Sequence, residues 1–590
     1  MGSAASAARR LAFALLGVSA LAACTTTPPP PLVNPGQQGV PTKVIDLNEV
    51  LVGVDRLARG FNPHALADQS VATTALATLI LPSAFRTGPD GVPRPDPAVL
   101  NSAQVTKSEP FTVTYSLRKD ASWSDGGPIA AEDFDYLWRQ MTTQPGTVNP
   151  AGYRLISNVV SKDSGKTVEV VFSKPYPGWR SLFRNLLPAH LLKDAFGGWN
   201  AVLDTSFPAS GGRFAIRQID LARGEVVLER NDRYWGTPAT LGRIVLRRTD
   251  TAGITAALRS GNEQLAVVTP DQAGMEQLSA LGEVAKLTTM PRGSTVQLLL
   301  RPVSPVLADV RMRTALVSLI DRNALIASGT GNGPAAALRA DAQVYGPAQA
   351  GYGATMPGDT PSAKPDHGRA DALLHELGYR RDGAGKWARE GRPLSITIGA
   401  PTDREPYASL AGLIRRQLAE FGIDAKVTNS GGDQLFGEML PSTPPTATSA
   451  ATSSTSAPPT STTGVPTTDA GVVDLAVVPQ VIDSDPATVL ASSFGCPPQG
   501  ADAPAVPANP AGFCDRTLQP VIDSALTGAA PLAQVLPGIE ATLWQQVVAV
   551  PLFQSADVLA TGADVTGVDP GPAFAGPFTT ANTWKRVPPK

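Results

Sequence analysis

The stretch from residue 111 to residue 141, FTVTYSLRKDASWSDGGPIAAEDFDYLWRQM, decides the fold class. Residues 111–117 alternate between large apolar side chains and threonine or serine, which is the period-two pattern of a half-buried strand. The segment WSDGGP at 123–128 is rich in turn-forming residues. From Ala131 onward, large apolar residues recur at helical spacing, which indicates an amphipathic helix. The stretch therefore predicts a strand, a turn and a helix in succession.

Similar units continue along the chain. A second strand is predicted at 167–172, where apolar residues alternate again. Asp309 is a suitable N-cap for a helix with one apolar stripe, formed by Met312, Leu316, Leu319 and Ile320. Strand and helix patterns interleave as far as Ile423, which predicts a mixed α/β protein.

The N-terminus has the layout of a secretory signal. Arg9 and Arg10 precede an apolar run at 11–21, which is too short to span a membrane, and Leu21-Ala22-Ala23 leads into Cys24. This pattern resembles a bacterial lipobox, in which Cys24 would be lipidated and become the first mature residue. The alternative is an ordinary secretory signal with an accidental cysteine. We expect residues 1–23 to be a lipoprotein signal peptide and the mature protein to lie on the extracytoplasmic face of the cell membrane.

Residues 24–42 are expected to form a tether. Thr, Pro, Gly and Gln dominate this segment, so it has almost nothing to bury and should remain extended. Elsewhere, no segment reaches the roughly 18 consecutive apolar residues that a spanning helix requires. The sequence therefore predicts a protein that is anchored to the membrane by lipid and does not cross it.

The charge balance bears on the class of partner. Lys and Arg total 49 against 51 Asp and Glu, which gives a net charge of -2, and no basic block is present. Nucleic acid and electrostatic docking on anionic lipid are therefore not expected.

Cys496 and Cys514 remain once Cys24 is assigned to the anchor. In an oxidising compartment such a pair is expected to form a disulfide, although two free buried thiols are the alternative. With this pair expected in a disulfide and only a few histidines beside it, no metal site and no cofactor is expected.

Residues 441–468 interrupt the folded pattern. They consist almost entirely of Pro, Ser, Thr and Ala, and supply no side chains for a core. We expect a disordered surface insertion, either unmodified or carrying O-linked sugars. Globular character returns at Val472, so the segment is interpreted as an insertion within a domain.

Segments that partly match catalytic or nucleotide-binding motifs lack a required residue. His375-Glu376 lacks the second histidine of a zinc helix, and Gly165-Lys166-Thr167 has Val160 where a phosphate-binding loop needs glycine. No Gly-x-Ser-x-Gly nucleophile elbow occurs. Scattered Asp and Ser residues could still assemble a site in three dimensions. The sequence nevertheless favours a binding protein over an enzyme.

Several motifs, in this order, resemble those of the family 5 extracytoplasmic solute-binding proteins, the peptide, nickel and oligosaccharide receptors of ABC importers. The resemblance rests on YSLR at 115–118, WSDGGPI at 123–129, AEDF at 131–134, LERN at 228–231, YWG at 234–236, ALRSG at 257–261, DVRMRTAL at 309–316, IDR at 320–322 and PLF at 551–553.

This resemblance implies a two-lobe periplasmic-binding-protein fold of the cluster C type, with an extra subdomain inserted in the first lobe and a hinge between the lobes. The expected limits are 43–75, 186–290 and 553–590 for lobe I, 76–185 for the inserted subdomain and 291–552 for lobe II. Trp123, Asp125, Arg311 and Arg313 are expected to be scaffold residues, the two arginines holding a helix of lobe II.

Departures from the family pattern affect the ligand. The resemblance implies a Trp and an amine-binding Asp shortly before an Asp-Pro or Glu-Pro pair in peptide receptors, but Pro479 and Ile482 occupy these positions here. A buried ammonium beside isoleucine would cost several kcal/mol unless Asp483 replaces the missing carboxylate. Asp483 and Asp485 are the candidate ligand contacts, although an Asp before Pro is equally typical of a turn.

Within the family, the chain is similar to a mycobacterial lipoprotein branch in SGGRF at 210–214, in ERNDRYW at 229–235, in the lipobox with its Pro-rich tether and in the missing peptide anchor. That similarity implies binding or access control of phosphatidylinositol mannoside intermediates in lipoarabinomannan synthesis, with the mannosylated lipid or a mannosyltransferase as partner. The alternative is a receptor that delivers peptide or another small solute to an ABC permease. An enzyme or a purely structural envelope protein is the third possibility.

Overall fold

A computed structural model describes residues 46–57, 59–88, 90–441, 472–498 and 507–588. The predicted signal peptide at 1–23, the lipidation site Cys24 and the tether at 24–42 lie outside the described residues. Of the predicted insertion at 441–468, all but Pro441 lies outside them as well.

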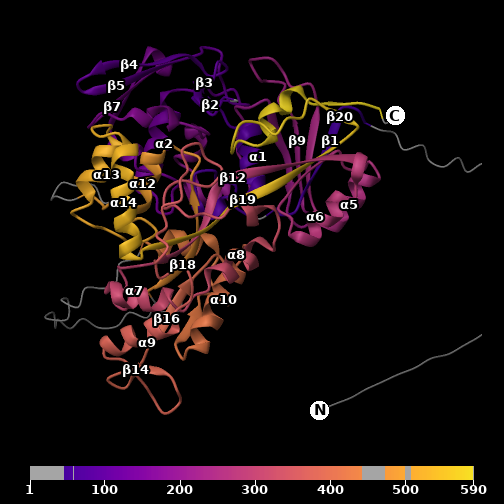
Figure 1. Cartoon of the computed structure of the whole chain (residues 1–590). Helices are drawn as coiled ribbons and strands as arrows, with labels where there is room; N and C mark the ends of the chain where they lie inside the picture. Colours follow the sequence, from indigo (N-terminus) through magenta and orange to yellow (C-terminus); the bar gives the residue numbers. More distant parts are fainter. Residues whose placement is uncertain (1–45, 58, 89, 442–471, 499–506, 589–590) are drawn as a thin grey trace, which may run out of the picture. The chain divides into compact units, whose positions relative to one another are not determined.

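A mixed ten-stranded sheet organises the fold (Figure 1). Its strand order is β17-β16-β18-β12-β19-β11-β1-β10-β9-β8. The strands are β1 (Glu49–Val54), β8 (Phe214–Asp220), β9 (Glu225–Arg230), β10 (Arg243–Arg248), β11 (Leu265–Val268), β12 (Ala285–Leu300), β16 (Ser395–Gly399), β17 (Asp424–Val427), β18 (Leu475–Val481) and β19 (Ala549–Gly562).

The long antiparallel strands β12 and β19 run through both halves of this sheet. Their register shifts between Pro291 and Thr295 of β12. On one side of the shift β19 pairs with β11, and on the other side β12 pairs with β18. We call the β11, β1, β10, β9 and β8 side the first lobe and the β18, β16 and β17 side the second lobe. The exact residue limits of lobe I, the inserted subdomain and lobe II given above stay a prediction.

A four-stranded antiparallel sheet forms from chain that precedes β8. Its order is β4-β5-β7-β6, with β4 (Leu100–Ser108), β5 (Phe111–Leu117), β6 (Ile156–Lys162) and β7 (Thr167–Phe172). Helix α2 (Ala131–Thr143) packs against β6 and β7. The predicted strands at 111–117 and 167–172 and the helix from Ala131 are therefore confirmed.

The turn between β5 and α2 is held by one buried carboxylate. Asp133, in the first turn of α2, accepts hydrogen bonds from Trp123 Nε1 at 3.2 Å, Ala130 N at 3.0 Å and Ala189 N at 2.9 Å. Trp123 is buried, whereas Asp125 lies at the surface with an oxygen 2.7 Å from His190 Nε2. Both residues thus belong to the scaffold of the turn.

The longer helices are divided between the two lobes, whereas α3 (Ala189–Leu192), α4 (Gly198–Leu203) and α11 (Gly432–Gln434) are short. The first lobe carries α1 (Val71–Ile80), α5 (Thr251–Arg259) and α6 (Gln272–Ser279). The second lobe carries α7 (Val310–Val317), α8 (Arg322–Thr330), α9 (His367–Glu376), α10 (Tyr407–Glu420), α12 (Pro486–Phe494), α13 (Gln519–Leu526) and α14 (Leu532–Gln546). Within the described part of the chain, no helix is long and apolar enough to cross a membrane.

The predicted helix after Asp309 is shorter than its apolar stripe. Asp309 caps α7 by accepting from Arg311 N at 2.8 Å, but the helix ends at Val317. Leu319 and Ile320 are buried in the link that follows, where Asp321 caps α8. The expected continuation through Ile320 was therefore wrong, because a second N-cap starts a new helix.

The two arginines of α7 differ in role. Arg313 is buried and donates to Gln546 O at 2.9 Å and Leu307 O at 2.7 Å, which ties α7 to the end of α14. Arg311 is exposed and its guanidinium bonds to the capping Asp309. Only Arg313 therefore holds the helix against the rest of the lobe.

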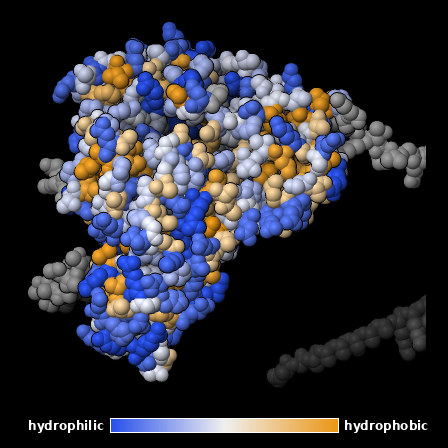
Figure 2. Space-filling model, in the orientation of Figure 1, coloured by the Kyte–Doolittle hydropathy of each residue, from blue (hydrophilic) through white to orange (hydrophobic). Residues whose placement is uncertain are grey.

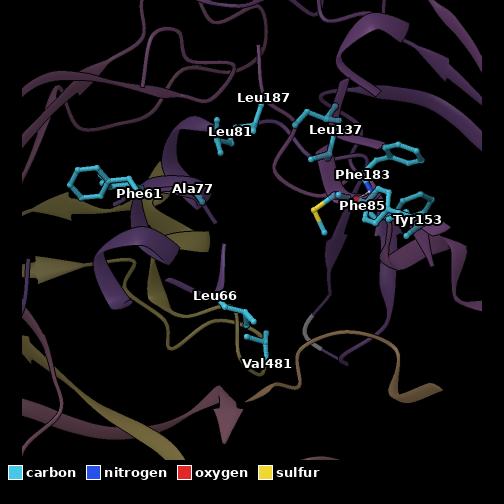
Figure 3. Close-up of a cluster of buried hydrophobic side chains, with 14 of the residues drawn as sticks. Phe61, Leu66, Ala77, Leu81, Phe85, Leu137, Tyr153, Phe183, Leu187 and Val481 are labelled. Carbon is cyan, nitrogen blue, oxygen red and sulfur yellow. Dashed lines mark hydrogen bonds between the residues drawn. The ribbon is translucent and has the colours of Figure 1, made fainter. Parts of the chain in front are cut away.

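The largest hydrophobic core crosses from the first lobe into the second. It includes Leu66, Ala77 and Leu81 together with Val481 and Ile482 at the end of β18. Figure 3 shows Leu66 beside Val481, and Phe85, Tyr153 and Phe183 as a separate group of the same core. On the face drawn in Figure 2, apolar residues form small groups among hydrophilic ones. The lobes therefore meet through packed apolar side chains.

Cys496 and Cys514 are joined by a disulfide, with their Cα atoms 4.6 Å apart. Replacing both with serine is expected to lower the free energy of unfolding by about 3 kcal/mol, because the bond closes a loop with a sequence separation of 18 residues. Urea unfolding followed by fluorescence measures this change. A reducing agent should lower the unfolding free energy of the native protein by the same amount and should have no effect on the double variant. If the double variant unfolds at the same urea concentration as the oxidised native protein, the prediction is contradicted.

Candidate functional site

A pocket of about 210 Å³ lies where the two lobes meet, at the register shift of β12. We call it the β12 pocket. One wall is residues 289–294 of β12, another is the start of α1, and a third is the segment 570–578, PGPAFAGPF. Most of its lining is apolar, with Arg292, Asp483 and Asp557 as its charged residues.

Asp557 and Arg292 form the polar floor of the β12 pocket. Asp557 Oδ1 accepts from Thr269 Oγ1 at 2.9 Å, and Oδ2 lies 3.6 Å from Arg292 Nε. Burial raises the pKa of Asp557 to about 6, although the neighbouring Arg292 opposes that rise. At neutral pH the negative charge of the Asp557 carboxylate is therefore partly offset by Arg292 at the floor of the mainly apolar β12 pocket.

A second pocket of about 100 Å³, the Arg184 pocket, adjoins the first. Both are lined by Gln69, Thr74, Asp483, Phe574 and Ala575. The second adds Arg86, Arg184 and Asn185, so its lining is much more polar.

The two aspartates selected from the sequence have different positions. Asp483 lines both pockets, and its carboxylate is 3.6 Å from Arg184 Nη1, with both side chains one-third exposed. Arg184 Nη1 also donates to Asp483 O at 3.2 Å. Asp485 instead caps α12, accepting from Thr488 N at 3.1 Å and Thr488 Oγ1 at 3.0 Å. Only Asp483 therefore remains a candidate ligand contact.

Ile482 is fully buried between the lobes. Its N–H donates to Gly293 O at 2.8 Å, and its carbonyl accepts from Gln349 Nε2 at 2.7 Å. The aliphatic side chain of Ile482 has no acceptor atom for an ammonium group. Pro479 lies in β18, paired with Val296 of β12.

Arg404 of the second lobe reaches the loop that leads into α1. Its Nη1 donates to Gln69 O at 3.1 Å, and its Nη2 lies 3.8 Å from Asp68 Oδ1. Asp68 is buried and its Oδ2 accepts from Asn62 N at 2.8 Å. Burial raises the pKa of Asp68 to about 7, with a smaller rise from nearby Asp433; the Asn62 hydrogen bond and Arg404 oppose it.

This buried carboxyl predicts a pH dependence of stability. The folded protein holds a proton on Asp68 at pH values between about 4 and 7, where the unfolded chain does not, so stability falls as pH rises through this window. Asp68→Asn is therefore expected to reduce the loss between pH 5 and pH 8 by about 2 to 3 kcal/mol, because about two pH units of this interval lie below the folded pKa. Thermal or urea unfolding at both pH values measures the difference, with the exposed Asp90→Asn as the control. Equal pH slopes in Asp68→Asn and the native chain would contradict this.

Sequence reasoning missed most of the pocket lining. Gln69, Arg184, Arg292 and Phe574 come from four separate segments, and no local pattern marks them. The one usable signal was the Pro/Gly-rich segment 570–578 with its two phenylalanines. Among the described residues, no group of three or more His, Cys, Asp or Glu side chains could hold a metal ion.

Comparison with known proteins agrees with this architecture. The family profile described as bacterial extracellular solute-binding proteins, family 5 middle, matches residues 94–497. A Mycobacterium tuberculosis protein named probable monoacyl phosphatidylinositol tetramannoside-binding protein LpqW is 35% identical over 569 residues, covering 88% of each chain.

Solved structures show the same fold at lower identity. The oligopeptide-binding protein AppA of Bacillus subtilis, in complex with a nonapeptide, has a TM-score of 0.68 at 15% identity, covering 92% of this chain and 99% of that one. The periplasmic EDTA-binding protein EppA has a TM-score of 0.66 at 22% identity, covering 92% and 97%. The chain therefore belongs to family 5 of the bacterial extracellular solute-binding proteins, which are extracytoplasmic binding proteins and not enzymes.

Proposed function

We propose that this chain is a lipid-anchored extracytoplasmic protein that binds, or controls access to, phosphatidylinositol mannoside intermediates of lipoarabinomannan synthesis. Its similarity to LpqW over 88% of both chains supports this role. The observation that carries the proposal is the fully buried Ile482, which stands where an amine-binding carboxylate is expected in a peptide receptor. An apolar pocket with a polar neighbour offers a place for a lipid with a sugar head.

Native mass spectrometry tests the ligand. The mature protein, released after Cys24 and purified from an actinobacterial host, is expected to carry a species with the mass of a phosphatidylinositol mannoside. A ladder of peptide masses would refute the proposal. An empty protein would refute lipid binding and favour a regulator that acts through contact with a mannosyltransferase.

The anchor is tested separately. Cys24→Ala is expected to release the protein from the membrane fraction into the medium or soluble fraction, because no other segment of the sequence is long and apolar enough to hold it. Metabolic labelling with an alkyne-bearing fatty acid should mark the native chain and leave the variant unlabelled. Unchanged membrane association of the variant would exclude Cys24 as the anchor.

The second candidate function is a receptor for peptide or another small solute in an ABC import system. Asp483 favours it, because its carboxylate lines both pockets and is one residue from the position of the expected amine-binding Asp. Under this alternative, Asp483→Asn should abolish binding of a peptide with a free amino terminus. Under the lipid proposal, such peptides do not bind to the native protein.

A further inference from the structure

Three pockets follow one another along α1 and share lining residues, so we treat them as one groove. The β12 pocket and the Arg184 pocket share five lining residues, among them Thr74 of α1. A third pocket of about 80 Å³, the Tyr234 pocket, shares Thr78, Arg86 and Thr579 with the Arg184 pocket. Thr74 and Thr78 are one helical turn apart, so the face of α1 that carries them forms a continuous floor.

The segment 570–582 lies over this floor. Its residues contribute to all three pockets, and its final turn (Pro577–Thr583) packs against α1. Phe574 stands between the first two pockets in a left-handed conformation, with φ of 68°. That conformation is rare for a bulky residue and persists only where its surroundings hold it. Gly293 allows the close approach, because a Cβ there would lie 2.7 Å from Asp483 Cβ and 3.1 Å from Phe574 Cβ.

The polarity of the groove changes along its length. At the β12 end the walls are mainly apolar, with Met290, Phe574 and Phe578 as the largest side chains. Beyond Thr74 the walls carry Arg184, Asn185 and Arg86. An elongated ligand that satisfies both ends must therefore be amphiphilic.

The polar end carries three arginines, Arg86, Arg184 and Arg213, and two aspartates, each of which is paired with an arginine. Arg184 lies 3.6 Å from Asp483, and Arg86 Nε is 2.5 Å from Asp96 Oδ2. Arg213 stacks over the ring of Tyr234, with its Cζ 5.1 Å from the ring centroid. Paired guanidinium and carboxylate groups present donors and acceptors side by side, which suits adjacent hydroxyl groups better than a lone anion.

We propose that this groove binds an amphiphile end to end, with an alkyl chain in the β12 pocket and a hydroxyl-rich head between Asp483 and Tyr234. This inference deepens the proposed function, on which it rests, by assigning the orientation and the class of ligand. The chain enters against Met290 and Phe574, and the hydroxyls of the head bond to the Arg184–Asp483 pair.

Isothermal titration with three probes tests the ligand class. The probes are n-octyl α-D-mannopyranoside, kept below its critical micelle concentration, methyl α-D-mannopyranoside and octanoate. The octyl mannoside is expected to bind at least tenfold more tightly than either other probe, because only it satisfies both ends. Equal affinity for octanoate would overturn recognition of the head, and equal affinity for the methyl mannoside would overturn use of the apolar end.

A blocking variant locates the probe. Thr74 is exposed on α1 at the junction of two pockets, so Thr74→Trp should fill the junction and weaken octyl mannoside binding at least tenfold. Lys107→Trp, the same bulky residue at an exposed position outside the lining of all three pockets, should bind within twofold of the native protein. Undiminished binding to Thr74→Trp would overturn the proposal.

The head contact is tested by Arg184→Gln, which does not depend on the folding of the tryptophan variant. It is expected to weaken the octyl mannoside at least fivefold and to leave octanoate unchanged. Arg180→Gln, at a nearby arginine outside the lining of all three pockets, is the control. Equal binding to both variants would overturn the assignment of the head.

Failure of this inference is distinguishable from failure of the proposed function. If octyl mannoside binds in the groove but no mannolipid copurifies, the groove stands and the biological ligand is wrong. If a mannolipid copurifies equally with the native protein and with Thr74→Trp, the proposed function stands and the groove assignment falls.

Discussion

Replacing Arg301 with leucine is expected to lower the free energy of unfolding by about 4 kcal/mol, because two buried carbonyls and one partly buried carbonyl lose their donor at once. The Arg301 guanidinium is buried and donates to Pro510 O at 3.1 Å, Val473 O at 2.8 Å and Leu440 O at 2.5 Å. Burial lowers the pKa of Arg301 to about 10, which leaves it charged at neutral pH, while nearby Asp474 favours the charge.

These three carbonyls belong to segments that the sequence places far apart. Leu440 and Val473 stand on either side of residues 442–471, and Arg301 follows directly after β12. The guanidinium thus holds together the two described segments that flank residues 442–471 in the sequence.

Urea unfolding monitored by tryptophan fluorescence measures the loss. The matched control is Arg311→Leu, the same substitution at an exposed arginine of the same lobe, which should cost less than about 1 kcal/mol. A loss for Arg301→Leu no larger than that of the control would contradict the prediction.

Replacing Asp133 with alanine is expected to lower the free energy of unfolding by about 3 to 4 kcal/mol. Three donors, Trp123 Nε1, Ala130 N and Ala189 N, would be left without their acceptor in a buried environment. Burial raises the pKa of Asp133 to about 6, against the effect of its three hydrogen bonds, so the group is mostly ionised at pH 7.5.

Thermal unfolding at pH 7.5 checks this second prediction. Glu132→Ala is the matched control, because Glu132 is the preceding acid of the same helix turn and its side chain is half exposed. Asp133→Asn, which keeps one acceptor oxygen, should fall between the native protein and Asp133→Ala. If alanine is tolerated at 133 as well as at 132, the carboxylate does not organise the turn.

Asp133 also shows how far local reasoning reaches. The sequence placed it at the start of a helix, and α2 begins at Ala131 as expected. The bond to Ala189 N could not be inferred, because Ala189 lies 56 residues further along the chain. A capping pattern identifies the start of the helix. The position of the third donor, Ala189 N, depends instead on how a distant part of the chain folds back against α2.

In the candidate site as well, the sequence identifies residues that only the tertiary structure can assign to a role. Asp483 and Asp485 could be selected from an Asp-Pro pattern, but the pattern could not separate a cap from a pocket residue, because both are aspartates beside a turn. The fold separates them: Asp485 bonds to Thr488 N in its own helix, and Asp483 faces Arg184, 299 residues away.

The sequence by itself determined the class of this protein and its local elements: β5, β7, the start of α2, the cap of α7 and the family motifs. These depend on alternation, helical spacing and capping, which act within a few residues. Only the tertiary structure decided that Gln69, Arg184, Arg292, Asp483 and Phe574 line adjoining pockets. Their proximity depends on strand order in a ten-stranded sheet and on how the two lobes pack together, and no short-range pattern encodes either.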